Sequence, residues 1–342
     1  MRLSDLHYEL PEELIAQEPL PDRAASRMLH LHRESGQVEH RVFRDITDLL
    51  SPGDLLVMND TRVTAVRLFG QRAGGGRTEA LLLREEEDGV FLALTKPAKR
   101  LRPGSEITFD GGLRARVESD EGDGKKRLRF AQAADWRALL GQVGRVPLPP
   151  YIQAELAEPN RYQTVYARTA GSSAAPTAGL HFTDEILDAL RAKGVATATV
   201  TLDVGIDTFR PIQVEDLRDH PMHGERCVMP EAAATAINAA QGRIIAVGTT
   251  SARTIESFAV GPRRVRSGEQ VTSIFITPEN PPQVFDSLLT NFHMPGTTML
   301  AMLAALVGVA PLRQAYQDAV SQQYRFLSFG DAMLILSASR GV

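Results

Sequence analysis

The chain has 342 residues, of which 43% are hydrophobic and 23% are charged. This composition is typical of globular proteins that bury a core, and the length favours two domains over one. The single cysteine, Cys227, excludes an internal disulfide and a cysteine-built zinc site. A formal net charge of −4 argues against a general nucleic-acid coat, although it leaves room for a local basic patch.

No apolar stretch reaches the length that crosses a bilayer. The longest, Met299–Ala310, predicts a buried helix instead. The N-terminal residues also lack the apolar core of a signal peptide. We therefore expect a cytoplasmic protein without a membrane partner.

The N-terminal region predicts a hairpin, a short helix and a buried strand in that order. The hairpin spans Met28–His32 and Gln37–Arg41, the helix Val42–Leu50, and the strand Leu55–Met58. Four polar residues follow the strand: Asn59, Asp60, Thr61 and Arg62. Such a cluster is either a binding group at the carboxyl end of a strand or an ordinary polar turn.

Residues 63–147 have a different pattern, because short alternating runs are separated by glycine-rich turns. This spacing predicts a small all-β unit, most simply a barrel. From Arg62 to Arg145 there are seventeen Lys/Arg against twelve Asp/Glu. The basic residues are either a solvated rim or a surface for a phosphate backbone. They gather in two clusters: Lys96, Lys99, Arg100 and Arg102, then Lys125, Lys126, Arg127 and Arg129.

After the stiff Pro147–Pro150 segment, strand and helix patterns alternate, which predicts an α/β fold with a mixed or parallel sheet. We expect an α/β body formed by 1–62 and 148–342, with the 63–147 antiparallel barrel inserted into it. The predicted strands are Val195–Val204, Arg243–Val247, Thr272–Thr277, Leu327–Phe329 and Met333–Leu336. The predicted helices are Glu185–Lys193, Glu231–Ala240, Ser251–Ala259 and Met299–Val309.

The run Pro176-Thr-Ala-Gly-Leu-His-Phe-Thr183 predicts a rigid turn just before a helix. Gly179 permits close backbone approach or a positive φ. His181, which titrates near neutrality when unperturbed, follows at once. The turn either carries a catalytic histidine or holds a structural one.

A second polar turn, Gly248 to Ser251, lies between a predicted strand and a helix. Thr249, Thr250 and Ser251 bring hydroxyls and free N–H groups to a helix start, which suits a carboxylate or phosphate. No Walker A or G-x-G-x-x-G loop is present. Arg253 and Glu256 are spaced to pair, either as a structural bridge or to position a substrate.

Three further groups of polar residues are candidates for a functional site. Asn291 and His293 end another predicted strand before a Pro-Gly turn. His220, His223 and Glu225 match no strong metal-binding spacing, so we predict no metal. Near the end of the chain, Tyr324, Arg325 and Asp331 either face a cleft or form a buried ion pair.

Taken together, these stretches resemble one family, the S-adenosylmethionine:tRNA ribosyltransferase-isomerases of queuosine biosynthesis. The resemblance implies an inserted β-barrel on an α/β body, with S-adenosylmethionine as substrate and no further cofactor. The runs that carry it are Tyr8–Pro11, Gly53–Val57, Asn59–Arg62, Pro147–Ile152, Tyr162–Tyr166, Ala174–Phe182, Met222 and His223 with Glu225, Val247–Ser251, Thr290–His293, Tyr324–Phe326 and Gly330–Met333.

The resemblance also implies the reaction. The family transfers the ribosyl part of S-adenosylmethionine to 7-aminomethyl-7-deazaguanine at the tRNA wobble position, which gives epoxyqueuosine and releases adenine and methionine. The sulfonium acidifies the ribose C5′ hydrogens, so a positioned base can form an ylide that expels adenine. The protein must then supply a base, a proton for adenine and a fixed orientation. We expect it to act as a monomer.

Residue roles follow from the resemblance as hypotheses. His181 is the first candidate for general base or acid, with Asp60, Arg253 and His293 as further catalytic candidates. For S-adenosylmethionine or the base we expect Thr177, Thr249, Thr250, Ser251, Asn59, Arg62, Arg325 and Asp331. For the anticodon stem-loop we expect Lys96, Lys99, Arg100, Arg102, Lys125 and Lys126.

The chain departs from the family pattern at two positions. Where the family usually has Thr-Leu-His-Val-Gly-x-Gly-Thr-Phe, Asp203 replaces the histidine and Asp207 a glycine. Either that histidine is not essential or the substrate of this chain differs. A non-catalytic anticodon-binding protein and a methyltransferase using the same sulfonium remain alternatives, and release of free adenine separates all three.

Overall fold

The computed structural model of the chain describes residues 1–132, 135–205, 212 and 214–339. Its residues divide into two units, each with its own core. The first contains Met1–Thr61, Pro149–Thr169 and Ala175–Val342, and the second contains Arg62–Leu148 and Ala170–Ala174. The predicted fold class, a mixed-sheet α/β body with a small antiparallel barrel, is confirmed.

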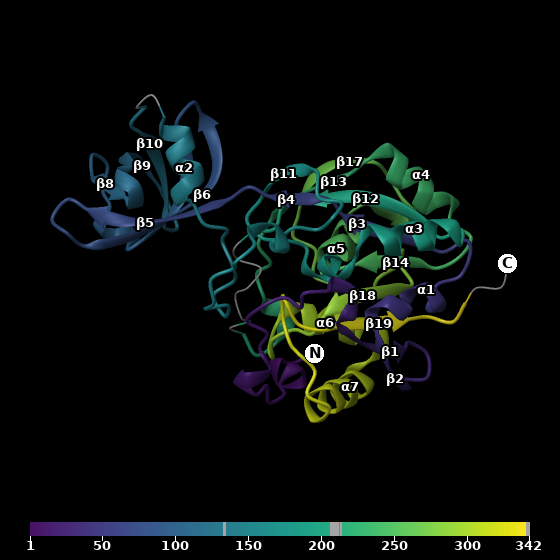
Figure 1. The fold of residues 1–342 in the computed structure, drawn as a ribbon. Coiled ribbons are helices and arrows are strands. Elements are labelled where there is room, and N and C mark those ends of the chain that lie inside the picture. The colour runs from purple at the N-terminus through teal and green to yellow at the C-terminus, as the bar shows by residue number, and fades with distance from the viewer. Residues whose placement is uncertain (133–134, 206–211, 213, 340–342) are drawn as a thin grey trace. The chain divides into compact units, whose positions relative to one another are not determined.

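A nine-stranded mixed sheet organises the first unit (Figure 1), in the order β17-β13-β12-β3-β14-β18-β19-β1-β2. Four neighbouring strands, β12, β3, β14 and β18, run parallel. Their carboxyl ends therefore meet at one edge of the sheet. The nine strands are β1 Arg27–His32, β2 Val38–Val42, β3 Leu55–Asn59, β12 Ala196–Leu202, β13 Glu225–Met229, β14 Ile244–Val247, β17 Gly268–Thr272, β18 Ser287–Asn291 and β19 Ala332–Leu336.

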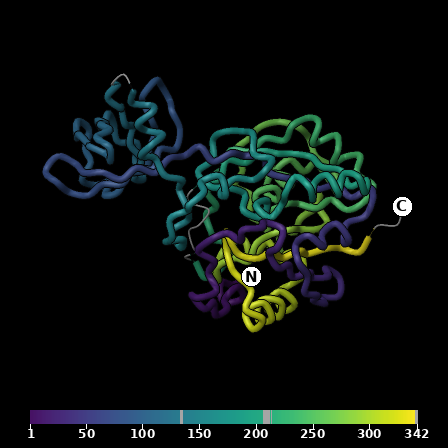
Figure 2. Tube along the Cα trace, viewed as in Figure 1, coloured from purple at the N-terminus to yellow at the C-terminus, as the bar shows by residue number. Residues whose placement is uncertain are grey.

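The two ends of the chain meet in this sheet. Strand β1 pairs in parallel with β19, so that Met28 lies opposite Ala332. The trace in Figure 2 shows these purple and yellow segments side by side. The central strands β3, β14 and β18 are buried along their whole length. This explains why β3 and β14 are almost continuously apolar rather than alternating, while β18 buries polar residues at its ends.

Helices and short turns cover the sheet. Helix α3 is capped by Thr183, whose hydroxyl accepts a hydrogen bond from the Ile186 N–H at 3.3 Å. Its apolar face shares one hydrophobic cluster with Phe43, Leu56 and Val247. The helices of this unit are α1 Ile46–Leu49, α3 Asp184–Ala192, α4 Glu231–Ala239, α5 Thr249–Ser257, α6 Thr298–Val307 and α7 Val309–Ser321. Its 3-10 turns are Leu3–Leu6, Glu12–Leu14, Arg23–Ala25, Phe43–Asp45, Pro159–Tyr162, Thr177–His181 and Leu217–Asp219.

The second unit is a closed six-stranded barrel, ordered β10-β7-β6-β5-β8-β9. Its core includes Phe109, Phe130 and Trp136, whose rings stack in sequence. Its strands are β5 Val66–Arg72, β6 Arg77–Glu87, β7 Val90–Lys96, β8 Glu106–Phe109, β9 Arg114–Gly122 and β10 Lys125–Phe130, with helix α2 Trp136–Val143 and the 3-10 turns Ala98–Arg100 and Asp110–Gly112. Two small sheets lie outside the barrel and the large sheet: β4 Thr61–Val63 with β11 Thr169–Ser172, and β15 Ala259–Gly261 with β16 Arg264–Val265.

Some predicted elements were wrong or displaced. The strand predicted at Thr272–Thr277 is not formed, because β17 ends at Thr272. The segment Leu327–Phe329 is not a strand, and Leu327 has a φ of +70°. Helix α5 begins at Thr249, two residues before the predicted start. The predicted helix at Val42–Leu50 is a 3-10 turn followed by the short α1.

The predicted helix Met299–Val309 breaks at Gly308, where α6 ends and α7 begins. Gly308 has a φ of +82°, which favours glycine and redirects the chain. No single described helix is long and apolar enough to cross a membrane; α6 and α7 pass that test only as a pair, which is bent by 115°.

Candidate functional site

A large cavity of the first unit has a volume of about 370 Å³ and lies at the carboxyl edge of the parallel strands. Cavities of this size hold small molecules in other proteins, and α/β sheets place them at this edge. Its lining residues are Pro150, Tyr151, Ala175–Ala178, Val204, Gly248–Thr250, Thr290–Met294, Thr297, Met299, Leu327 and Ser328.

One wall of the cavity is the start of helix α5. Gly248 turns the chain from β14 into the helix with a φ of +84°, a conformation that favours glycine. Thr249 and Thr250 follow and line the cavity. The Ser251 hydroxyl instead donates to the Val247 carbonyl at 2.7 Å, so it caps the strand end. The helix start therefore offers an anion its main-chain N–H groups and two of the three predicted hydroxyls.

Arg253 and Glu256 do not pair, so the predicted ion pair between them is wrong. The buried Arg253 guanidinium pairs with the buried Glu225 carboxylate, and it also donates to the Thr272 carbonyl at 3.4 Å. Glu256 accepts hydrogen bonds from the Gln283 and Val284 N–H groups, each at 2.9 Å. The charge of Arg253, in the middle of α5, is thus compensated by Glu225.

Another part of the wall is formed by the residues at and after the end of β18. Asn291 and His293 both line the cavity. The Thr290 hydroxyl and the His293 Nε2 atom lie 2.7 Å apart. Burial lowers the pKa of His293 to about 3, so its imidazole is neutral at pH 7. Of the two histidines predicted for catalysis, His293 is the one that lines this cavity.

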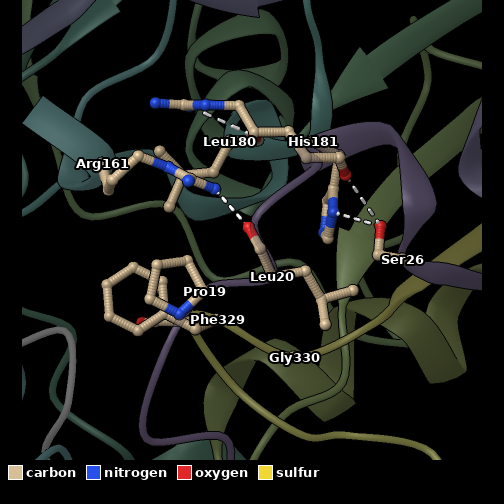
Figure 3. A pocket seen from close by; sticks show the side chains of 10 residues that line it. Pro19, Leu20, Ser26, Arg161, Leu180, His181, Phe329 and Gly330 are labelled. Atoms are coloured by element: carbon tan, nitrogen blue, oxygen red, sulfur yellow. Dashed lines mark hydrogen bonds between the residues drawn. The ribbon is translucent and has the colours of Figure 1, made fainter.

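His181 occupies a separate position behind Asn291. It does not line the large cavity but a smaller one of about 30 Å³, which also contains Arg23, Ser26 and Arg161. Figure 3 shows His181 facing Ser26 across this pocket, while Arg161 reaches the Leu20 carbonyl. His181 is 5% exposed and stacks on the Phe43 ring.

Hydrogen bonds connect His181 to the large cavity. The Thr177 hydroxyl donates to the Asn291 side-chain oxygen at 2.9 Å, so the Asn291 amide N–H faces the His181 Nε2 atom at 3.2 Å. Nε2 is then an acceptor, and the proton sits on Nδ1, which donates to the Ser26 hydroxyl at 2.7 Å. Ser26 in turn donates to the Arg23 carbonyl at 3.2 Å. The chain of contacts fixes one neutral tautomer of His181.

Electrostatics around His181 favour the same neutral form. Burial, followed by the nearby Arg23 and Arg325 charges, lowers the pKa of His181 to about 4. The Arg23 guanidinium donates to three main-chain carbonyls, those of Gln163, Leu180 and Asn160. The turn that carries His181 depends on Gly179, because a Cβ there would lie 1.9 Å from the Tyr166 hydroxyl. Glycine is required here because the Tyr166 hydroxyl lies so close to the backbone, and not because the backbone has a positive φ.

The polar residues at and after the end of β3 hold strand ends together and do not line the cavity. Asn59 is fully buried; its side chain donates to the Leu202 carbonyl at 3.0 Å and to the Thr250 hydroxyl at 3.2 Å. Asp60 accepts from the Thr201 hydroxyl at 2.7 Å and from Arg168 at 3.1 Å. The side chain of Arg62 is exposed on β4. For Asn59 and Asp60 the ordinary structural interpretation fits these contacts.

Arg325 and Asp331 are likewise engaged by the backbone. The Asp331 carboxylate accepts from the N–H groups of Arg27 and Arg325, at 2.9 and 2.8 Å. The Arg325 guanidinium donates to the Glu18 carbonyl. Neither the predicted cleft position nor a side-chain ion pair between Arg325 and Asp331 is formed in the described contacts.

The structure describes one of the two positions at which the chain departs from the family pattern. Asp203 pairs with the Arg226 guanidinium at 3.2 Å and lies 3.4 Å from the Thr61 hydroxyl. Asp207 lies outside the described residues. The Asp203 carboxylate therefore has a positive partner that a neutral histidine would not need.

The two basic clusters of the barrel differ in their partners. Lys126 is 2% exposed and pairs with Asp120, contrary to its predicted exposure. Arg127 pairs with Glu86 and Glu87 of β6, Arg129 pairs with Glu118 of β9, and Lys125 is half-buried. By contrast, no described carboxylate forms an ion pair with the exposed first cluster, which is Lys96, Lys99, Arg100 and Arg102.

The sequence interpretation missed several residues of the cavity wall. Tyr151 lines it, and its hydroxyl lies 2.7 Å from the Ser328 hydroxyl. Met294 and Met299 supply apolar surface. The aromatic residue directly after the Pro147–Pro150 segment was the available signal for Tyr151; nothing in the pattern singled out the methionines.

The comparisons with known proteins match almost the whole chain, and they all point to one family. The family model described as "Queuosine biosynthesis protein" matches residues 3–335. The S-adenosylmethionine:tRNA ribosyltransferase-isomerase of Symbiobacterium thermophilum is 51% identical over 98% of this chain and 100% of its own length. The protein of the same name from Moorella thermoacetica is 47% identical with the same coverage. A crystal structure of S-adenosylmethionine tRNA ribosyltransferase from Thermotoga maritima is 36% identical over 97% of this chain and 100% of that one, with a TM-score of 0.56.

Proposed function

This chain belongs to the family of queuosine biosynthesis proteins, the S-adenosylmethionine:tRNA ribosyltransferase-isomerases, and from that premise we propose its substrates and the roles of its residues. The enzyme transfers and isomerises the ribosyl group of S-adenosylmethionine onto 7-aminomethyl-7-deazaguanine at the tRNA wobble position. The products are epoxyqueuosine in the tRNA, free adenine and methionine. The match along almost the entire chain, at 51% identity to a relative of this name, carries the proposal.

The cavity of about 370 Å³ is the proposed site for S-adenosylmethionine. This substrate carries a carboxylate at one end and an uncharged purine at the other. The start of α5, with the N–H groups of Thr249 and Thr250, suits the carboxylate because a helix N-terminus carries partial positive charge. The apolar surface of Phe292 and Met299 suits the uncharged parts of the substrate. Arg253, already paired with Glu225, supports the helix and leaves the carboxylate to the main chain.

His293 is the proposed acid–base group, because it is the histidine that lines this cavity. The reaction begins when a base removes a C5′ proton beside the sulfonium, and the resulting ylide expels adenine. The neutral imidazole of His293 has the charge state that this step requires. His181 is a positioning residue: it fixes Asn291 through Nε2 and touches the cavity only through that amide.

The exposed cluster Lys96, Lys99, Arg100 and Arg102 of the barrel is the proposed contact for the phosphates of the anticodon stem-loop. Basic side chains without a carboxylate partner are free to replace counterions on RNA. Lys126, which the sequence led us to expect at the RNA, is paired with Asp120, so we do not include it in the proposed RNA surface. Arg127 of the same cluster is likewise paired, with Glu86 and Glu87. We expect the protein to act as a cytoplasmic monomer that needs no further cofactor.

Adenine release tests the proposal directly. The purified protein is incubated with S-adenosylmethionine, with and without an anticodon stem-loop that carries the aminomethyl-deazaguanine, and adenine is quantified by chromatography. We expect adenine only when the modified stem-loop is present, in one-to-one ratio with epoxyqueuosine. Tight, salt-sensitive RNA binding without adenine would instead support a non-catalytic anticodon-binding protein. Methyl transfer to RNA with release of S-adenosylhomocysteine would support a methyltransferase.

A further inference from the structure

The hairpin of β1 and β2 brings together three side chains that bind metals in other proteins. His30 and His32 are two residues apart on β1, so they project from the same face of the strand. Glu39 lies directly opposite His30 in the register of β2. One ligand atom from each of the three lies within 4.8 Å of the others. Neighbouring strands thus place two imidazoles and a carboxylate around one point.

His30 lacks the hydrogen bonds that a buried imidazole normally makes. The residue is 4% exposed, yet neither Nδ1 nor Nε2 has a hydrogen-bond partner. A Glu39 carboxylate oxygen lies 3.8 Å from Nδ1, beyond hydrogen-bonding distance. Leaving a buried polar atom unpaired is costly, so an unpaired group of this kind in a folded protein calls for an explanation. A cation between His30 and Glu39 would satisfy the ring.

The other two ligands are accessible. The His32 Nε2 atom lies 2.9 Å from the Glu39 carboxylate, and both side chains are more than one-third exposed. Ligand atoms around zinc stand roughly 3.3 Å apart, a spacing that rotation of the exposed His32 and Glu39 side chains can reach.

One competitor lies beside the cluster. The Arg41 guanidinium donates to a Glu39 oxygen at 2.6 Å and 3.1 Å through its two nitrogens. Arg41 is 43% exposed in its side chain, so it can turn into solvent when a cation takes the carboxylate. Its charge still opposes cation binding, which makes Arg41 a useful probe of the site.

We propose that His30, His32 and Glu39 form a binding site for a divalent transition metal of the zinc type. Two imidazoles and a carboxylate, without a thiolate, suit zinc or cobalt better than calcium or magnesium. None of the three residues lines the 370 Å³ cavity. The metal would link the edge strand β2 to β1, so its role is to stabilise the hairpin rather than to take part in ribosyl transfer. The sequence expectation of no metal did not consider this hairpin.

Cobalt binding tests the site with a readout that is independent of activity. The full-length protein is freed of metal with a chelator and titrated with Co²⁺, and the visible absorption of the bound ion is recorded. We expect one ion per chain, displaced by Zn²⁺, and a zinc-dependent rise in Tm. His32→Ala and Glu39→Gln should each weaken binding at least tenfold, because each removes one of three ligands.

Two matched variants complete the experiment. His40→Ala, on the same strand but bonded to Tyr324 and Asp318, should leave the affinity within twofold. Arg41→Gln should tighten binding, because it removes the competing charge. The proposal is overturned if Co²⁺ gives no one-to-one spectrum, if binding survives both His32→Ala and Glu39→Gln, or if Arg41→Gln weakens it. His30→Leu, compared by far-UV circular dichroism, separates loss of the site from loss of the fold.

Discussion

Asn291 donates its side-chain N–H to the Nε2 atom of His181, 3.2 Å away, while its side-chain oxygen accepts from Thr177. Asn291 lines the large cavity and His181 does not. The histidine on the Pro-Thr-Ala-Gly turn is therefore linked to the cavity through the Asn291 amide. On this contact we propose that His181 orients Asn291, whereas the sequence led us to expect His181 as the reacting base.

Replacing Asn291 by aspartate should raise the pKa of His181. The new carboxylate would stand within hydrogen-bonding distance of Nε2 and favour the imidazolium, an effect of about 1 to 3 pH units. The wild-type value is about 4. The measurement is a pH titration of the imidazole nitrogens by NMR on histidine-labelled protein.

Thr177→Val is the matched control for this titration. It removes the hydrogen bond at the other side of Asn291 without adding charge. We expect the His181 pKa to stay close to that of the wild type in this variant. An unchanged pKa in Asn291→Asp would show that residue 291 does not face the ring.

Acid should destabilise the fold between about pH 6.5 and pH 4. The pKa of His181 is lowered from its ordinary 6.5 to about 4 in the folded chain, so the unfolded chain binds the proton first. The stabilising contribution is complete above pH 6.5 and is lost as pH falls through this window. Its full size is about 3 kcal/mol for this single histidine. Urea denaturation at several pH values measures it.

His181→Gln is the comparison for the acid experiment. Its amide does not titrate, so the free energy of unfolding should fall less steeply between pH 6.5 and pH 4. The slope of this free energy against pH should differ from that of the wild type by up to the contribution of one bound proton. The remaining slope comes from other buried groups, including His293, whose pKa is lowered to about 3. If wild type and His181→Gln have the same slope, His181 does not titrate as described.

Thr249→Asp should separate substrate binding from stability. A carboxylate at the first residue of α5 interacts favourably with the helix dipole, by about 0.3 to 1 kcal/mol. The same charge would repel the carboxylate of S-adenosylmethionine. We expect an equal or higher Tm together with a KM for S-adenosylmethionine raised at least tenfold.

Thr249→Asn controls for side-chain shape, because it is close in size to aspartate and carries no charge. We expect its KM to remain within about threefold of the wild type, which corresponds to less than about 0.7 kcal/mol. If Thr249→Asp and Thr249→Asn have the same KM, the start of α5 does not bind the carboxylate.

Neutralising the exposed barrel cluster should flatten the salt dependence of tRNA binding. Each lost phosphate contact removes roughly 0.7 to 0.9 from the slope of log K against log salt. Replacing Lys96, Lys99, Arg100 and Arg102 by alanine together should therefore lower the slope by as much as about 3. Filter binding or fluorescence anisotropy at several salt concentrations gives the slope.

Arg127→Gln is the control for the barrel experiment. Arg127 lies 3.0 Å from Glu87 and 3.4 Å from Glu86, so its charge is already compensated. We expect an unchanged slope in this variant. A slope that drops as much for Arg127→Gln as for the four-residue variant would contradict the assignment of the RNA surface to the first cluster.

The sequence by itself determined the architecture, because local patterns encode it. Alternating runs between glycine-rich turns gave the barrel, and continuous apolar runs gave the buried strands β3 and β14. The order and number of short motifs identified the family. Errors fell where a pattern was short or ambiguous: the strand expected at Thr272–Thr277, and the break at Gly308 inside a continuous apolar run.

Tertiary structure decided which polar residues share a site. Asn59 and Asn291 end buried strands, and Thr249 follows one. The sequence could not tell that the Asn59 side chain bonds to Leu202 and Thr250 while the other two residues line the cavity. The partner of Arg253 lies 28 residues away at Glu225, across the fold, and not one helical turn along the chain at Glu256. Hydrogen-bond partners and burial depend on contacts between distant segments, and no local periodicity records them.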